Sequence, residues 1–169
     1  QFDKFINFFG KNSLIIDCSF SKEQSLFESI KQIQRNAEIA VRQGVTQIIL
    51  SDKELSNSKL PIPMLLCVGA INSFLIVKKL RGYVSINVQS GEALDTHSFA
   101  TLIGVGATTV NPYLAFDSLY QRHKKKLFEQ FSFDECVERY IKSVNAGLLK
   151  IMSKMGISVL SSYRGGCNF

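Results

Sequence analysis

Residues 84–112 read VSINVQSGEALDTHSFATLIGVGATTVNP, and this stretch decides the fold class. A short apolar run at Val84–Val88 has the pattern of a strand. The turn residues Ser90-Gly91-Glu92 follow, and Ala93–Ile103 has the spacing of a helix. Two glycines then lead into a second short strand at Thr108–Val110, which an Asn-Pro pair ends. A strand, a helix and a second strand in roughly 30 residues have the size of one parallel β/α unit.

The same alternation extends over the whole chain. Two helices are expected to begin at capping boxes, one with Ser21 and Gln24 and one with Ser132 and Glu135. The predicted helices cover about 21–43, 61–81, 93–103, a segment from Tyr113, and 132–155. The predicted strands are Leu14–Cys18, Gln47–Ser51, Val84–Val88, Thr108–Val110 and Ile157–Leu160.

Strands that alternate with helices indicate parallel β/α units in an α/β fold. A complete (β/α)8 barrel takes about 250 residues. The 169 residues therefore predict a single domain, 1–169, that forms a partial TIM-like barrel. An open sheet is the second possibility. The first residue, Gln1, and the ending Gly165-Gly-Cys-Asn-Phe169 favour a segment of a longer polypeptide.

Composition and charge exclude several classes. The formal net charge is +6, and the densest basic run, Arg122–Lys126, contains no interleaved aromatic residue. We interpret this run as a solvated connection between helices and expect no nucleic-acid partner. No stretch reaches the roughly 18–20 apolar residues of a membrane-spanning helix, so no membrane partner is expected.

Metal and nucleophile motifs are not evident. The four cysteines, Cys18, Cys67, Cys136 and Cys167, are too far apart in sequence for a zinc or iron–sulfur motif. Reduced thiols in a cytoplasmic protein explain them most simply. Gly104 and Gly106 follow a helix and precede a strand, which is the reverse of a dinucleotide-binding loop, so we interpret them as tight packing.

Polar residues stand at the end of each predicted strand, where a β/α barrel gathers its site. The residue type alone does not distinguish a site from ordinary loop polarity. These residues are Asp17, Asp52, Gln89–Glu92, Asn111 and Ser161–Ser162.

Three groups of segments together resemble the later part of the central domain of the glutamate synthase large subunit. The likeness runs from about residue 40 to the end. The chain departs from the family pattern at Gln89, where Glu is more common, at Ser98, where His is more common, and near Cys167, where Gln is more common. The segments are PIPMLLCVGA at 61–70; VQSGEA at 88–93 with His97, Phe99, Ala100, Gly104, Gly106, Ala107 and NPYLAF at 111–116; and YIK at 140–142, GLLKIMSKMGI at 147–157 and SYRGG at 162–166.

The resemblance implies a parent enzyme that makes L-glutamate from L-glutamine and 2-oxoglutarate with FMN and a 3Fe-4S cluster. It implies that this segment is a scaffold between the amidotransferase and FMN-binding domains, with no catalytic, cofactor or metal residue of its own. As an isolated segment it is then expected to be inactive. A small electron-donating subunit or ferredoxin would be a further partner of the parent. The residues expected to serve interdomain or structural contacts are Ser90, Gly91, Glu92, Asn111, Pro112, Tyr113, Tyr163, Arg164 and Gly165.

Turn chemistry is the simpler explanation for several of these residues. Gly91 and Gly165 would supply permissive backbone, and Asn111-Pro112 would end a strand. For Glu92 and Arg164 the hypothesis is an interdomain ion pair or hydrogen bond. An alternative function stays open at this point: a free-standing half barrel that binds phosphate or a flavin through the strand-end loops.

Overall fold

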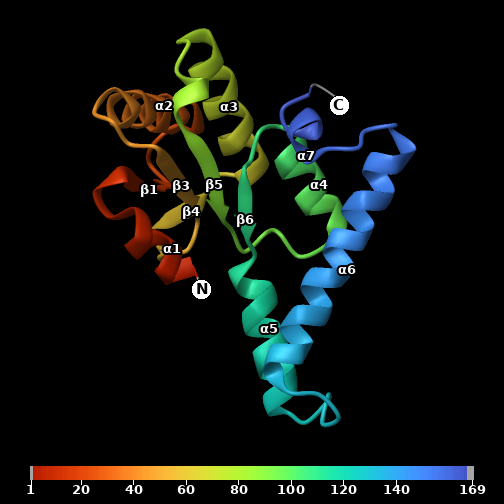
Figure 1. The fold of residues 1–169 in the computed structure, drawn as a ribbon. Helices are drawn as coiled ribbons and strands as arrows, with labels where there is room; N and C mark the ends of the chain where they lie inside the picture. Colours follow the sequence, from red (N-terminus) through yellow and green to blue (C-terminus); the bar gives the residue numbers. More distant parts are fainter. Residues whose placement is uncertain (1, 167–169) are drawn as a thin grey trace.

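A computed structural model describes residues 2–166. Four parallel strands form the central sheet in the order β1-β3-β5-β6, which is also their order along the chain (Figure 1). They are β1 (Ser13–Asp17), β3 (Gln47–Ser51), β5 (Ser85–Gln89) and β6 (Thr109–Asn111). Helices connect successive strands, so the predicted parallel β/α units and the partial barrel are confirmed.

The helices follow the strands in the expected alternation. The connecting helices are α2 (Leu26–Arg42), α3 (Met64–Val77) and α4 (Thr96–Gly104); α5 (Tyr113–Lys124), α6 (Phe133–Lys154) and the short α7 (Leu160–Tyr163) come after β6. The predicted capping box of α6 is present. The Ser132 hydroxyl accepts from the Glu135 N–H, and the Glu135 carboxylate accepts from the Ser132 N–H.

The capping box predicted at Ser21 is wrong. Ser21 lies in β2 (Ser19–Ser21), which pairs antiparallel with β4 (Lys59–Pro61). The helix begins one turn later, where the Ser25 hydroxyl accepts from the Glu28 N–H at 3.2 Å. A Ser with Gln or Glu three residues later occurs at both positions, as Ser21 with Gln24 and as Ser25 with Glu28. Pairing with a segment 38 residues away decides against the first, since the register joins Ser21 to Lys59.

The strand predicted at Ile157–Leu160 is also wrong. The Ile157 N–H donates to the Met152 carbonyl at 3.0 Å and closes the end of α6, where Gly156 has φ +70°. The Ser162 N–H then donates to the Val159 carbonyl at 3.1 Å within the turn that forms α7. These local hydrogen bonds occupy the backbone, so no strand forms here. Ser161 and Ser162 therefore do not join the strand-end residues.

Besides β2, β4 and α7, three further elements were not predicted. The helix α1 (Phe2–Phe9) and the one-turn η1 (Gly10–Asn12) precede the sheet, and η2 (Arg81–Tyr83) precedes β5. The predicted helix starts at 61 and 93 each lie three residues early. Pro61 pairs in β4, and the Asp95 carboxylate caps α4 by accepting from the Ser98 N–H at 2.8 Å. The basic run 122–126 forms the last turn of α5 and the residues after it.

The two faces of the sheet differ in chemistry. On the face that packs against α2 and α3, one register row joins Ile16, Leu50 and Val88, all part of the main hydrophobic core. The opposite face would line the interior of a complete barrel, and it is mostly polar apart from Ile15 and Ile49. There the Thr109 hydroxyl donates to Asn87 Oδ1 at 2.8 Å, and Asn87 Nδ2 donates to Gln47 Oε1 at 3.0 Å. These bonds tie three strands in one register.

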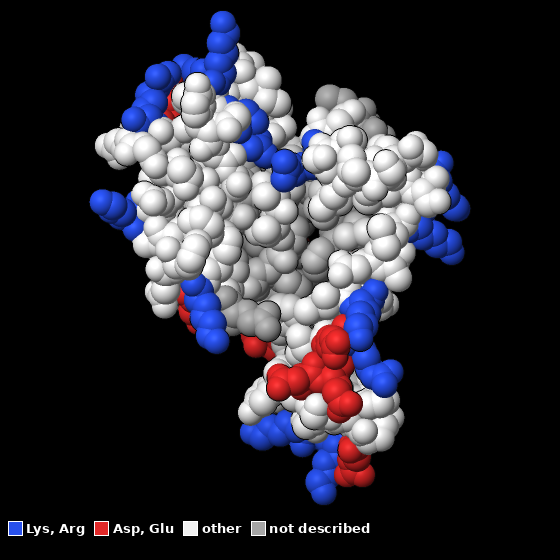
Figure 2. All heavy atoms as spheres, viewed as in Figure 1, with Lys and Arg blue, Asp and Glu red and all other residues white. Residues whose placement is uncertain are grey.

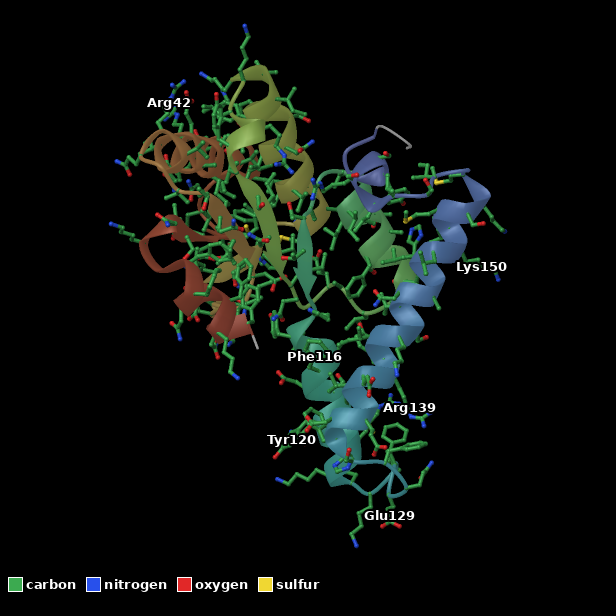
Figure 3. The ribbon with its side chains drawn as sticks, viewed as in Figure 1. Arg42, Phe116, Tyr120, Glu129, Arg139 and Lys150 are labelled. Atoms are coloured by element: carbon green, nitrogen blue, oxygen red, sulfur yellow. The ribbon has the colours of Figure 1, made fainter. Side chains whose placement is uncertain are left out.

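A helical hairpin projects from the body of the molecule. Figure 1 shows α5 and the first half of α6 extending together away from the sheet. Phe116 and Tyr120 on α5 face α6 (Figure 3), with ring centroids 5.9 Å from Tyr140 and 5.5 Å from Phe133. At the tip, the Arg139 guanidinium lies 3.9 Å from the ring centroid of Phe131. We name residues 113–139 the arm.

Two helical glycines give a matched test of this packing. A Cβ at Gly147 would lie 2.5 Å from Thr96 Cγ2, because α6 crosses the start of α4 there, whereas a Cβ at Gly69 would meet nothing within 4 Å. Gly69→Ala should raise the free energy of unfolding by about 0.5–1 kcal/mol through helix propensity. Gly147→Ala should lower it by about 1–3 kcal/mol through overpacking. Urea denaturation of the two variants measures both, and a stabilising Gly147→Ala would show that the crossing is looser than described.

Candidate functional site

The carboxyl ends of β3, β5 and β6 bring six of the predicted residues together. A buried carboxylate, Asp52, lies at the centre of this cluster and is 3% exposed. The Ser90 hydroxyl donates to Asp52 Oδ2 at 2.6 Å, and the Gly91 N–H donates to Asp52 Oδ1 at 3.0 Å. The Ser90 N–H donates to the Asn111 carbonyl at 3.0 Å, which joins the loop after β5 to the end of β6. We name Asp52, Ser90, Gly91, Glu92, Asn111 and Tyr113 the carboxyl-edge cluster.

Glu92 caps a neighbouring helix from within the chain. Its Oε2 accepts from the Met64 N–H at 3.0 Å, at the start of α3. The first N–H groups of a helix have no partner inside it and carry partial positive charge, so a carboxylate there is stabilising. Pro63 precedes this helix and supplies no side-chain cap. In this structure Glu92 therefore caps α3.

Gly91 is required for close approach. Its φ is not in the left-handed region, but a Cβ there would lie 2.6 Å from Leu114 Cδ1 and 3.1 Å from the Tyr113 hydroxyl oxygen. The turn chemistry predicted for Pro112 agrees with the structure, since β6 ends at Asn111 and α5 begins at Tyr113.

Tyr113 is held in its neutral form. Burial, and then the carboxylates of Asp52 and Asp117, raise the pKa of Tyr113 to about 12. A neutral phenol beside Asp52 is a hydrogen-bond donor throughout the physiological range. Because its folded-state pKa lies above the ordinary value of 10, the stabilisation it gives is complete below about pH 10 and is lost as the pH rises toward 12.

Titration of the phenolate absorbance should detect this shift. The difference between the wild-type and Tyr113→Phe absorbance at 295 nm should have a midpoint near pH 12 in the folded chain, because the deprotonated form is disfavoured by burial. The same difference measured in denaturant is the control and should have its midpoint near pH 10. A folded-state midpoint near pH 10 would contradict the burial of this phenol.

The remaining predicted residues lie at the opposite, amino-terminal end of the sheet. The Tyr163 hydroxyl donates to the Ala100 carbonyl at 3.1 Å, and the Gly165 N–H donates to the Ile103 carbonyl at 3.3 Å. Gly165 has φ +66°, as expected of a permissive position. Arg164 lies between these two residues in the sequence, and its positive charge adds to the effect of burial in lowering the pKa of Arg81. Glu92 and Arg164 therefore belong to different ends of the sheet.

Sequence reasoning missed the residue that organises this end. Arg81 Nε donates to Asn72 Oδ1 at 2.6 Å, Nη1 to the Val84 carbonyl at 2.6 Å, and Nη2 to the Gly106 carbonyl at 2.8 Å. Burial, and then the charge of Arg164, lower the pKa of the guanidinium from its ordinary value. Gly106 has φ +127°, and a Cβ there would lie 2.5 Å from Asn72 Cγ. We name Asn72, Arg81 and Gly106 the amino-edge clasp.

The fold also brings two distant cysteines together. Cys18 and Cys67 are 0% and 1% exposed. A hydrogen bond with Cys67, and then burial, raise the pKa of the Cys18 thiol well above its ordinary value. Both thiols are free, as is buried Cys136, and Cys167 lies outside the described residues. Within residues 2–166 no three His, Cys, Asp or Glu side chains are grouped as a metal site would require.

Comparison of the sequence with known proteins shows the family of this chain. The family model of the glutamate synthase central domain matches residues 2–169. The chain belongs to the glutamate synthase central domain family. Within this family it is 44% identical over 172 residues to the glutamate synthase [NADPH] large chain of Azospirillum brasilense, covering 100% of this chain and 11% of the relative.

Relatives with different electron donors share the segment. The Bacillus subtilis glutamate synthase [NADPH] large chain is 47% identical and the chloroplastic ferredoxin-dependent glutamate synthase of Spinacia oleracea 38% identical, covering 89% and 90% of this chain. The chain spans about a tenth of the length of each, since 10% of both relatives is covered.

A solved structure supports the barrel architecture. This glutamate synthase central domain is similar to DHODH from Eimeria tenella, solved in complex with ferulenol, with a TM-score of 0.59, 15% identity, and coverage of 92% of this chain and 38% of that chain. At this identity the likeness concerns the fold alone. Among the described residues, no helix has the length and apolar character that crossing a membrane requires.

Proposed function

We propose that this chain is the later part of the central domain of a glutamate synthase large chain and acts as a scaffold between its amidotransferase and FMN-binding domains. The parent would make L-glutamate from L-glutamine and 2-oxoglutarate in the cytoplasm. Family membership supports the parent. The observation that supports the scaffold role is the carboxyl-edge cluster, where a barrel enzyme would present reactive groups to a substrate.

In this cluster the polar groups serve one another. Asp52 accepts from Ser90 and Gly91, and Glu92 caps α3. Every buried side-chain nitrogen or oxygen within the described residues has a hydrogen-bond partner. A catalytic acid or base needs a direction from which a substrate proton can approach. The geometry instead ties three strand ends into one rigid edge.

The residues that the structure describes, 2–166, do not suit the cofactors of the parent enzyme. An iron–sulfur cluster needs several thiolates around one point, whereas Cys18 and Cys67 are buried together and Cys136 lies on α6. A flavin phosphate at the barrel mouth would meet the carboxylate of Asp52. We therefore propose that FMN and the 3Fe-4S cluster are bound by other parts of the parent, and that a small electron-donating subunit or ferredoxin contacts those parts.

Two experiments test the proposal. An antibody against residues 134–150 should detect a native polypeptide far above 18.9 kDa on a denaturing blot, whereas a band at 18.9 kDa would exclude the parent.

In the full enzyme, Glu92→Ala and Arg164→Ala should each raise the amount of glutamine hydrolysed per glutamate formed, because a loosened scaffold uncouples the two half-reactions. The matched control is Glu129→Ala at the exposed tip of the arm. Unchanged coupling and unchanged stability in both variants would remove the interdomain role of these two residues.

A further inference from the structure

The last strand of the sheet has an unpaired edge beside an apolar cleft. Within residues 2–166 β6 pairs only with β5, so its other edge is open. Next to this edge lies a cleft of about 420 Å³ between β6, α4 and α6, to which α1 and α5 also contribute phenylalanine side chains. Its walls include Phe99 and Ile103 from α4 and Ile141, Val144 and Leu148 from α6, and none of its lining residues is charged. Figure 2 shows a hollow between the two halves of the molecule whose walls are largely free of charged side chains.

The open edge presents backbone groups as well as apolar surface. The Asn111 carbonyl accepts from the Ser90 N–H on the β5 side. Adjacent residues of a strand direct their backbone groups to opposite edges, so the N–H and C=O of Val110 face the cleft. Ile141 is 39% exposed and Leu160 is 42% exposed at its walls. Unpaired backbone groups beside an uncharged apolar wall are the surface that an added strand covers.

We propose that an extended segment of the same polypeptide, from outside residues 1–169, adds as a parallel strand to the open edge of β6 and fills the cleft. This inference rests on the proposed function, because it needs the longer parent chain. The four strands of the central sheet follow one another in chain order and pair in parallel, and the similar DHODH chain continues beyond the 38% that is covered. A second copy related by a two-fold axis would instead pair β6 with β6 antiparallel.

The two faces of β6 specify the sequence of the added strand. Val110 continues the apolar row through Leu50 and Val88. Thr109 continues the row through Ile49 and Asn87, which is polar at β5 and β6. Side chains beside Val110 therefore point toward α4 and α6 and must be apolar and uncharged. Their neighbours along the strand point toward the polar interior face and are small and polar.

Hydrogen exchange of the full-length large chain, resolved to single amides, tests the pairing. The Val110 amide should exchange at least about a hundredfold more slowly than in an unfolded peptide, because a paired amide exchanges only when the sheet opens. The Ile49 amide, in a strand paired on both sides, is the internal reference. Rapid exchange at Val110 beside a protected Ile49 would overturn the proposal.

A pair of variants tests the filling of the cleft in the same full-length chain. Ile141→Glu places a charge against the added strand and should accelerate exchange at Val110 at least tenfold. Leu149→Glu, on an exposed part of the same helix outside the cleft, should leave it unchanged. Equal effects of the two variants on exchange at Val110 would overturn the proposal. An exchange rate at Val110 that depended on protein concentration would also overturn it, because that would indicate pairing with a second copy. A short native polypeptide on the blot would contradict the proposed function itself. A long polypeptide with an unprotected Val110 amide would contradict only this inference.

Discussion

Replacing Arg81 with alanine is expected to lower the free energy of unfolding by about 3–5 kcal/mol. The substitution removes three hydrogen bonds from a charged donor and leaves Asn72 Oδ1 and the carbonyls of Val84 and Gly106 to find other partners. Val84 and Asn72 are buried, so water replaces the guanidinium poorly. The three acceptors come from the middle of α3, the residue before β5 and the residues before β6. Losing the clasp therefore loosens three elements at once.

Urea denaturation followed by far-UV circular dichroism measures this loss. Arg81→Lys retains the charge but presents a compact ammonium in place of the planar fork, so it should recover only part of the stability. Arg35→Ala, at an exposed position on α2, is the matched control and should change stability by no more than about 0.5 kcal/mol. Equal effects of Arg81→Ala and Arg35→Ala would show that the clasp contributes nothing beyond an ordinary surface arginine.

The second large effect is expected from Gly106→Ala, with a loss of about 2–4 kcal/mol from backbone strain and a steric clash together. The backbone at Gly106 has φ +127°, and the new Cβ would lie 2.5 Å from Asn72 Cγ. Asn72 cannot turn aside freely, because its Oδ1 is held by Arg81 at 2.6 Å. Gly44→Ala is the matched control, since Gly44 has φ +92° and open space around it. It should show the strain alone, about 1–2 kcal/mol.

A double-mutant cycle separates the two contributions. In the Asn72→Ala background the clash at residue 106 is relieved, so Gly106→Ala should cost about 1–2 kcal/mol less than in the wild type. Additive losses would show that Asn72 is not the obstacle. The measurement is the same urea titration on all four members of the cycle.

The sequence predicted the sheet better than the segments around it. Gln47–Ser51 was placed to the residue, and the remaining confirmed strands were shifted by one residue, because short apolar runs between polar turns carry an unambiguous period. The capping box at Ser132 was confirmed, since its partners lie within one turn of helix. The strand predicted at Ile157–Leu160 was wrong because a short apolar run is also compatible with a turn, and local hydrogen bonds form that turn. The cap predicted at Ser21 was wrong because its spacing is also compatible with a strand, and pairing with the distant β4 forms that strand.

The candidate site shows the same limit. The residues that follow strands β3, β5 and β6 were expected at one edge, and Asp52, Ser90 and Asn111 meet there because parallel strands align their carboxyl ends. The role of Arg81 was not predicted. Its role depends on acceptors 9 and 25 residues along the chain, and no local pattern encodes them. Cys18 and Cys67 were likewise judged by their separation in sequence.

The arm gives the molecule a mechanical property. Helix α6 has 22 residues and is therefore about 33 Å long. Its close crossing with α4 at Gly147 divides it into a longer part of about 21 Å toward the tip and a shorter part of about 10 Å toward α7. Helix α6 is also held on both sides of this point, because Val144, Leu148 and Met152 lie in the hydrophobic core. The Tyr140 hydroxyl donates to the Leu94 carbonyl at 3.1 Å, so the fold anchors the helix from Tyr140 onward. A neighbouring domain that pushed the tip sideways would therefore bend the arm where it leaves the body of the molecule, near Tyr140.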